Sequence, residues 1–94
     1  MKTDYIKIDV AATSQINIAA NNVSPSVKTN PVNIPNGYKF SHVVRVYSNN
    51  SGIYTSMNSV SNNGSTVSLN LCGINLSTSQ QKCSLYGLVC FIKK

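Results

Sequence analysis

Apolar and polar residues alternate along most of this chain with a period of two, which is the pattern of half-buried β-strands. A helical period of 3.6 residues does not persist over any stretch of about 12 positions. Strands are predicted at residues 5–10, 15–20, 38–48, 53–60, 66–71 and 82–92, with a less regular one at 23–29 around Pro25. We therefore expect an all-β protein, a single antiparallel β-sandwich that is jelly-roll-like, with about seven or eight strands and no substantial helix.

The longest predicted strand follows a turn at Pro35-Asn36-Gly37. The ring of Pro35 holds φ near −65° and Gly37 accepts positive φ, so the chain can reverse there. Strict alternation then puts five residues on one side, namely Tyr38, Phe40, His42, Val44 and Val46, and five on the other, namely Lys39, Ser41, Val43, Arg45 and Tyr47. We expect a central strand, in which His42 is a packed core or interface residue.

The strongest hairpin signal in the chain is Asn63-Gly64, because this pair suits a two-residue type I′ turn. Residues 53–71 are therefore predicted to form a hairpin. Its second strand is a half-buried one whose inward residues are Val67, Leu69 and Leu71.

The last predicted strand is apolar on both faces. One face carries Cys83, Leu85, Val89 and Phe91, and the other carries Tyr86, Leu88, Cys90 and Ile92. A strand of this kind is covered on both faces, either by a partner subunit or by loops and the N-terminal segment of its own chain. The second set, Tyr86, Leu88, Cys90 and Ile92, is the candidate subunit interface, and we expect the protein to bind itself.

Composition supports one β-rich domain over residues 1–94, since apolar residues make up 41% of the chain and charged residues only 11%. The net charge is +6, from eight Lys or Arg residues against two acids, Asp4 and Asp9. The basic residues are spread along the chain rather than clustered, which argues against nucleic acid as a partner and is typical of charges that keep a protein soluble.

The chain offers few groups for catalysis. His42 is its one histidine, and Cys72, Cys83 and Cys90 show no CxxC spacing. Zinc, nucleotide and calcium motifs are missing from the sequence, so we predict no catalytic residue, no metal site, no cofactor and no enzymatic activity. The cysteines are expected to be small buried hydrophobes that stay reduced.

The sequence does allow a ligand-binding role. Tyrosine together with Asn and Ser forms adaptable polar surfaces of the kind that contact carbohydrates. Such residues flank the loop at 48–52 and continue through the loop at 61–65. The candidate ligand surface consists of Tyr47, Asn49, Asn50, Tyr54, Asn62 and Asn63. The alternative is that these tyrosines pack strand ends and that the loops are merely solvated.

The first residues contain no apolar segment of the kind that a secretory signal peptide requires. No segment of the sequence is apolar over the length of a membrane span, so membrane insertion is not expected. We therefore expect synthesis in a cytoplasm without ordinary secretion.

The order of these patterns resembles that of small β-rich bacteriophage virion proteins, namely the head domains of tail fibres and head fibres, and baseplate or decoration subunits. The resemblance covers about residues 30–94 and is carried by four segments: 32–40 with its Pro-Asn-Gly-Tyr-Lys turn, 43–46, 64–71, and the apolar end at 85–92.

The resemblance implies a homotrimeric structural subunit of the virion, made in a bacterial cytoplasm. Its partners would be further copies of itself, other virion proteins and a host surface glycan. Tail fibres usually carry a long N-terminal shaft that this chain lacks, which favours a stand-alone fibre head, a decoration protein or a baseplate component. The alternative function is that of a monomeric soluble module that binds carbohydrate or single-stranded nucleic acid.

Overall fold

The computed structural model describes residues 4–12 and 14–94, which form ten β-strands. In chain order they are β1 (Tyr5–Ala11), β2 (Ile16–Ile18), β3 (Asn22–Val23), β4 (Val27–Lys28), β5 (Val32–Asn33), β6 (Tyr38–Ser48), β7 (Ile53–Asn62), β8 (Thr66–Asn75), β9 (Gln81–Cys83) and β10 (Leu85–Lys93). No helix occurs in these ranges, so the all-β prediction is confirmed. The strands outnumber the prediction because the chain breaks at Ser24–Ser26 and at Ser84, and because Val32–Asn33 forms a further short strand, β5, against β8.

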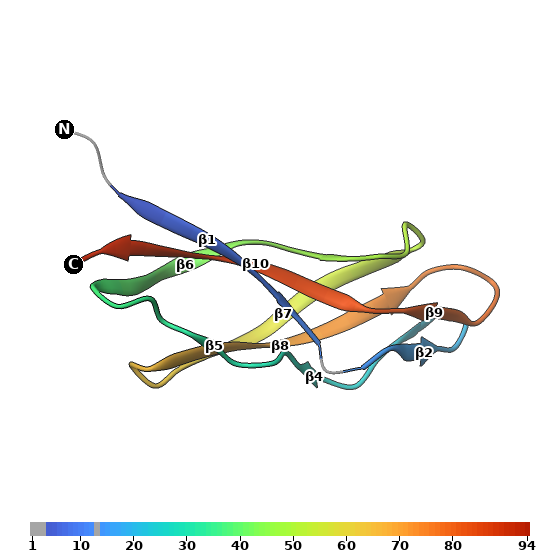
Figure 1. The fold of residues 1–94 in the computed structure, drawn as a ribbon. Helices are drawn as coiled ribbons and strands as arrows, with labels where there is room; N and C mark the ends of the chain where they lie inside the picture. Colours follow the sequence, from blue (N-terminus) through green and yellow to red (C-terminus); the bar gives the residue numbers. More distant parts are fainter. Residues whose placement is uncertain (1–3, 13) are drawn as a thin grey trace.

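The strands form two main antiparallel sheets and one small one. The first main sheet has three strands in the order β1-β10-β6. In the second, β8 pairs with β7 on one side and with the short strands β3, β4 and β5 on the other, while β2 and β9 form a two-stranded ribbon. Figure 1 shows β6 and β10 in one layer and β5 and β8 in the other, along the 49 Å length of the molecule.

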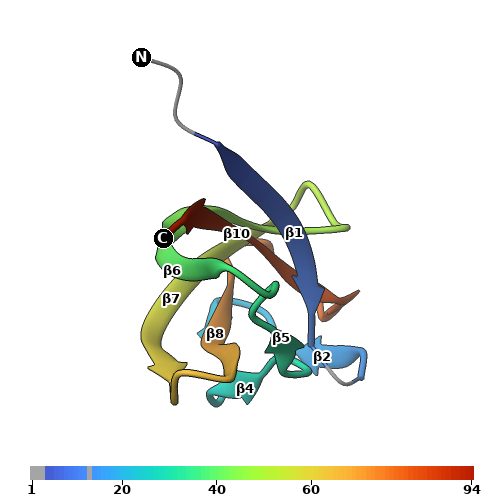
Figure 2. The ribbon, with the colours of Figure 1, turned by 60° about the vertical axis from the view of Figure 1, so that its left-hand side comes forward.

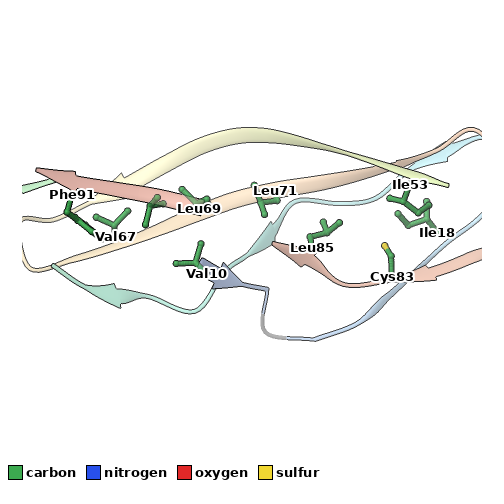
Figure 3. Close-up of a cluster of buried hydrophobic side chains, with 10 residues drawn as sticks. Val10, Ile18, Ile53, Val67, Leu69, Leu71, Cys83, Leu85 and Phe91 are labelled. Carbon is green, nitrogen blue, oxygen red and sulfur yellow. The ribbon is translucent and has the colours of Figure 1, made fainter. Parts of the chain in front are cut away.

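The core lies between β8 and β10, the middle strands of the two main sheets (Figure 3). Val67, Leu69 and Leu71 of β8 are fully buried, as predicted, and face a second set of fully buried residues from β10, namely Leu85, Val89 and Phe91. Burial of each such side chain contributes about 1.5–3 kcal/mol relative to exposure. Val10, Ile18, Ile53 and Cys83 close the same cluster.

The turn before β6 forms as predicted: Gly37 has φ of 86°, and the Tyr38 N–H donates to the Pro35 carbonyl at 3.0 Å. The prediction of a central strand is wrong, because β6 pairs with β10 alone and lies at the edge of its sheet. The strict alternation predicted for β6 is also wrong, because its register against β10 shifts twice, at Ser41 and at Val44. Each bulge inserts one residue and reverses which side chains face the core. Val43 therefore packs on the core with Phe40 and Val46.

The same two bulges decide where His42 lies. Strict alternation predicts His42 and Val44 on the core side with Phe40, but both are exposed and lie on the opposite side of the sheet. The core half of the prediction for His42 is therefore wrong, whereas the interface half stays a prediction. His42 stands directly opposite Cys90 of β10 on the outer face of the three-stranded sheet.

The β7–β8 hairpin is present, but its turn differs from the type I′ prediction. The loop holds three residues, and of Asn63 and Gly64 only Gly64 takes positive φ, at 89°. The Asn63 side-chain oxygen accepts from the Ser65 and Thr66 N–H groups at 2.9 and 2.8 Å, which stabilises the longer loop.

Gly87 allows the two sheets to approach closely. It is buried at the middle of β10, and a Cβ atom there would overlap Cδ1 of the fully buried Leu69. We expect Gly87→Ala to lower the free energy of unfolding by about 1–3 kcal/mol, because a packed core cannot absorb the methyl group without strain. Urea unfolding measures this. Gly52→Ala in an exposed loop is the control, and an equal loss in both variants would contradict the packing argument.

Candidate functional site

The structure divides the candidate ligand surface between two ends and two faces of the molecule. Asn49 and Asn50 precede β7, whereas Asn62 and Asn63 lie at its far end. Ten extended residues span about 33 Å. The two loops stand at opposite ends in Figure 1, so the six residues do not form one contiguous site.

Tyr47 and Tyr54 are also apart. Tyr47 pairs with Tyr86 on the outer face of the three-stranded sheet, and Tyr54 pairs with Ile74 on the outer face of the five-stranded sheet. The tyrosines therefore point away from each other across the sandwich. A ligand that contacts one of them does not reach the other.

The side chain of Asn50 stabilises its own loop, and its polar atoms are already hydrogen-bonded rather than available to a ligand. Its Nδ2 donates to the Lys82 carbonyl at 3.1 Å and to Gln81 Oε1 at 3.2 Å, and its Oδ1 accepts from the Gly52 N–H at 2.9 Å. Asn49 Oδ1 accepts from the Ser84 N–H at 2.9 Å, at the break between β9 and β10. These side chains hold the β6–β7 loop against β9 and β10.

The loop at the other end borders a polar groove of about 480 Å³. Its walls carry hydroxyl, amide and ammonium groups from Lys28, Ser61, Asn62, Asn63, Thr66 and Ser68. Asn62 Oδ1 accepts from the Gly64 N–H at 3.0 Å, whereas its Nδ2 donates no hydrogen bond within the described residues and is available to a ligand. Sequence reasoning found the two asparagines and missed Lys28, which comes from the other side of β8.

Tyr54 belongs to an exposed apolar row across three strands. Val23 of β3, Ile74 of β8 and Tyr54 of β7 are direct register partners, and Val23 and Tyr54 are 59% and 63% exposed. We call these three residues the Tyr54 row. Strand pairing alone brings Val23 to this surface, so the sequence could not reveal it.

The four residues of the candidate subunit interface share the outer face of the three-stranded sheet. Cys90 is 4% exposed, and Tyr86, Leu88 and Ile92 are half-buried. Charged residues of β1 and β6 flank them in register: Asp9 and Arg45 beside Leu88, and Lys7 beside Cys90. We call this surface the outer face.

Side chains from both flanking strands meet above β10. The Tyr47 hydroxyl donates to Asp9 Oδ1 at 2.8 Å, and the Tyr47 ring stacks on Tyr86 with centroids 5.3 Å apart. The Arg45 guanidinium lies 4.4 Å from the centre of the Tyr47 ring. The hydrogen bond to Asp9 raises the pKa of Tyr47, and burial adds to it. One end of the outer face is thus covered from within the chain.

The other end of the outer face is open. A shallow groove of about 310 Å³ is lined there by Tyr5, Lys7, His42, Val44, Cys90 and Ile92. Val44 is 39% exposed because of the bulge in β6. Most of the lining is apolar, which suits contact with another apolar surface.

The structure brings Cys90 and His42 together, the pair that a thiol nucleophile would need. No hydrogen bond joins them among the described residues: Cys90 Sγ lies 3.9 Å from the Phe91 carbonyl, and His42 Nδ1 lies 2.9 Å from Ser41 Oγ. Across residues 4–12 and 14–94, no three His, Cys, Asp or Glu side chains gather as metal ligands. The three cysteines are buried and unpaired in disulfides, and burial raises the pKa of Cys83.

Mutation of a loop asparagine and mutation of Tyr54 should affect stability differently. Asn50→Ala leaves the Gly52 N–H and the Lys82 carbonyl without their partner, so we expect the free energy of unfolding to fall by about 1–2 kcal/mol. Tyr54→Ala removes an exposed side chain and should change stability little. Chemical denaturation of both variants measures this, and a larger loss in Tyr54→Ala would refute the assignment.

The Tyr47–Asp9 bond predicts a dependence on alkaline pH. Because the folded pKa of Tyr47 is raised, its contribution is fully present below the unfolded pKa of about 10 and is lost as pH rises through the folded pKa. The stability difference between wild type and Tyr47→Phe should be constant from about pH 6 to 9 and should shrink above about pH 10. Thermal unfolding across this range is the measurement, and a constant difference up to about pH 12 would contradict the bond.

Comparison with known proteins adds no assignment to these surfaces. The chain matches no protein-family model, no curated protein and no solved structure with which we compared it. The described residues contain no helix with the length and apolar character needed to cross a membrane. The functional interpretation therefore rests on the two sheet faces and the polar groove.

Proposed function

We propose that the protein is a non-enzymatic structural subunit that assembles as a homotrimer through its outer face, in the manner of a phage fibre head or another virion surface protein. The observation that carries this proposal is the row of Tyr86, Leu88, Cys90 and Ile92 along an outward sheet face. The resemblance to small virion proteins supports the three-fold assembly and the place on a virion.

The outer face has the composition of an interface. Its centre is apolar and aromatic, and its rim carries the charged residues Lys7, Asp9, Lys39 and Arg45. Interfaces typically show this division, with charge depleted at the core and a polar rim. Three such faces around a common axis would bury the open groove next to Val44 and Ile92.

This assembly leaves the candidate adhesive surfaces outside. The Tyr54 row and the five-stranded sheet lie on the opposite side of the sandwich from the outer face. The polar groove at Lys28 and Asn62 offers hydroxyl and amide groups of the kind that bind a glycan. A host surface glycan is therefore the ligand that we propose for the trimer.

The same groove supports a second candidate function, that of a monomeric carbohydrate-binding module. In that case, the outer face of β10 would be covered only by its neighbours, as Tyr47 and Asp9 cover Tyr86. Binding of single-stranded nucleic acid has less support, because the groove contains one basic residue, Lys28.

The trimer is tested by Leu88→Lys, which puts a charge next to Arg45 at the centre of the outer face. We expect light scattering after size exclusion to show about a third of the wild-type mass, since an unpaired charge buried in an interface is strongly unfavourable. Val23→Lys on the opposite sheet is the matched control and should keep the wild-type mass. A wild type that is monomeric at every concentration would overturn the trimer and favour the monomeric module.

Glycan binding is tested separately with the groove variants Lys28→Ala and Asn62→Ala. Each should lower adhesion to host cells or retention on a glycan array several-fold, while the Tyr54→Ala effect shows whether the Tyr54 row takes part. Full adhesion in all three variants would refute recognition by these surfaces.

A further inference from the structure

Within the part of the chain that the structure describes, no strand pairs with the outer edge of β1 over residues 5–9. The Asp4 carbonyl accepts from the Lys93 N–H, and the Ala12 N–H donates to the Leu85 carbonyl, so even-numbered residues of β1 bond to β10. The backbone groups of the odd-numbered residues therefore point away from the sheet. At the far end, the Asn30 N–H donates to the Ala11 carbonyl and closes the edge.

The other long outer strands have bulges and lie next to each other, whereas β1 has only its charged side chains, Lys7 and Asp9, as protection. β6 has two bulges and β7 has one, between Met57 and Ser59, and these two strands lie next to each other. Bulges and coverage are the usual means by which proteins prevent edge pairing. β1 instead keeps a single register with β10 over its whole length, and Figure 2 shows it at the side of the sandwich away from β7.

We propose that β1 pairs with β1 of a second copy, antiparallel, with Ile8 on the two-fold axis. Only registers that keep inward residues opposite inward residues preserve the core faces. With Ile8 on the axis, Lys7 of each copy stands opposite Asp9 of the other, and the two residues can exchange backbone hydrogen bonds. An axis at Lys7 or Asp9 would instead oppose like charges.

The inward face of the pair also gains cover. Ile6 and Ile8 are only half-buried, because they lie at the end of the sheet. In the proposed register, Ile8 meets Ile8 of the second copy and Ile6 meets its Val10. The three-stranded sheet would then continue as β6-β10-β1 followed by the same three strands in reverse order.

This contact differs from the proposed trimer in its symmetry and in its use of the backbone edge, although Lys7 and Asp9 also lie on the rim of the outer face. The two-fold axis of the edge contact is perpendicular to the plane of the three-stranded sheet. The three-fold axis of the trimer, toward which the three outer faces point, is parallel to that plane. The two contacts can therefore occur in one assembly. The mass distinguishes them: the edge alone makes dimers, the outer face alone makes trimers, and both together make hexamers.

The test exchanges charges at positions 7 and 9. Lys7→Asp alone and Asp9→Lys alone each oppose like charges, and each should raise the dissociation constant of the dimer by about tenfold or more. The double variant Lys7→Asp/Asp9→Lys restores opposite pairs and should restore dimerisation. An equimolar mixture of the two single variants should also associate, because each then meets its complement. Lys82→Asp is the matched control for a charge reversal elsewhere, and should leave association unchanged.

Sedimentation of wild type, variants and mixture from about 10 μM to 1 mM gives the masses. Hydrogen exchange gives a second readout: the Lys7 and Asp9 amides should slow several-fold as the concentration rises, while the Ile8 amide, bonded within the sheet, should not respond. An outer-face trimer would not slow these edge amides. The edge proposal would be overturned if wild type at about 1 mM shows no two-fold association. It would also be overturned if the mixture associates no more strongly than either single variant. Neither result would bear on the trimer.

Discussion

The contact between β8 and β10 is the interaction on which the rest of this structure depends. Each is the middle strand of its sheet, and their inward residues form most of the fully buried core. Gly87 lets Leu69 approach β10, so the sheets pack without a cavity at that point. The remaining strands attach to this pair, which explains why β3, β4 and β5 can be only two residues long.

Asparagine side chains satisfy several backbone polar groups around this thin core. Asn75 is fully buried, and the two hydrogens of its Nδ2 are shared among the carbonyls of Ile18, Ala19 and Ser79. Asn50 and Asn63 stabilise the two hairpin loops in the same way. Most of these asparagine side chains therefore stabilise loops. Only polar groups that are not used in this way, such as Nδ2 of Asn62, remain available to a ligand.

The outward faces and edges carry the proposed function because the core leaves them uncovered. The outer face of β10 is apolar although it points away from the core, and the β1 edge is regular although edges are usually interrupted. Both features cost solubility in an isolated subunit and become favourable on assembly. The structural subunit that we propose would account for both features together.

From the sequence alone, the period of two determined the all-β class, the inward residues of β8 and the division of β10 into two apolar faces, and the Asn63-Gly64 pair indicated the hairpin, since each of these signals is local in the chain. The turn at Gly37 was equally readable, because its chemistry is local. Only the tertiary structure decided the outward position of His42 and Val44, since a bulge depends on the partner strand and leaves no local pattern. The separation of Asn50 from Asn62 and the meeting of Val23 with Tyr54 were likewise decided by strand pairing, which joins residues distant in the chain.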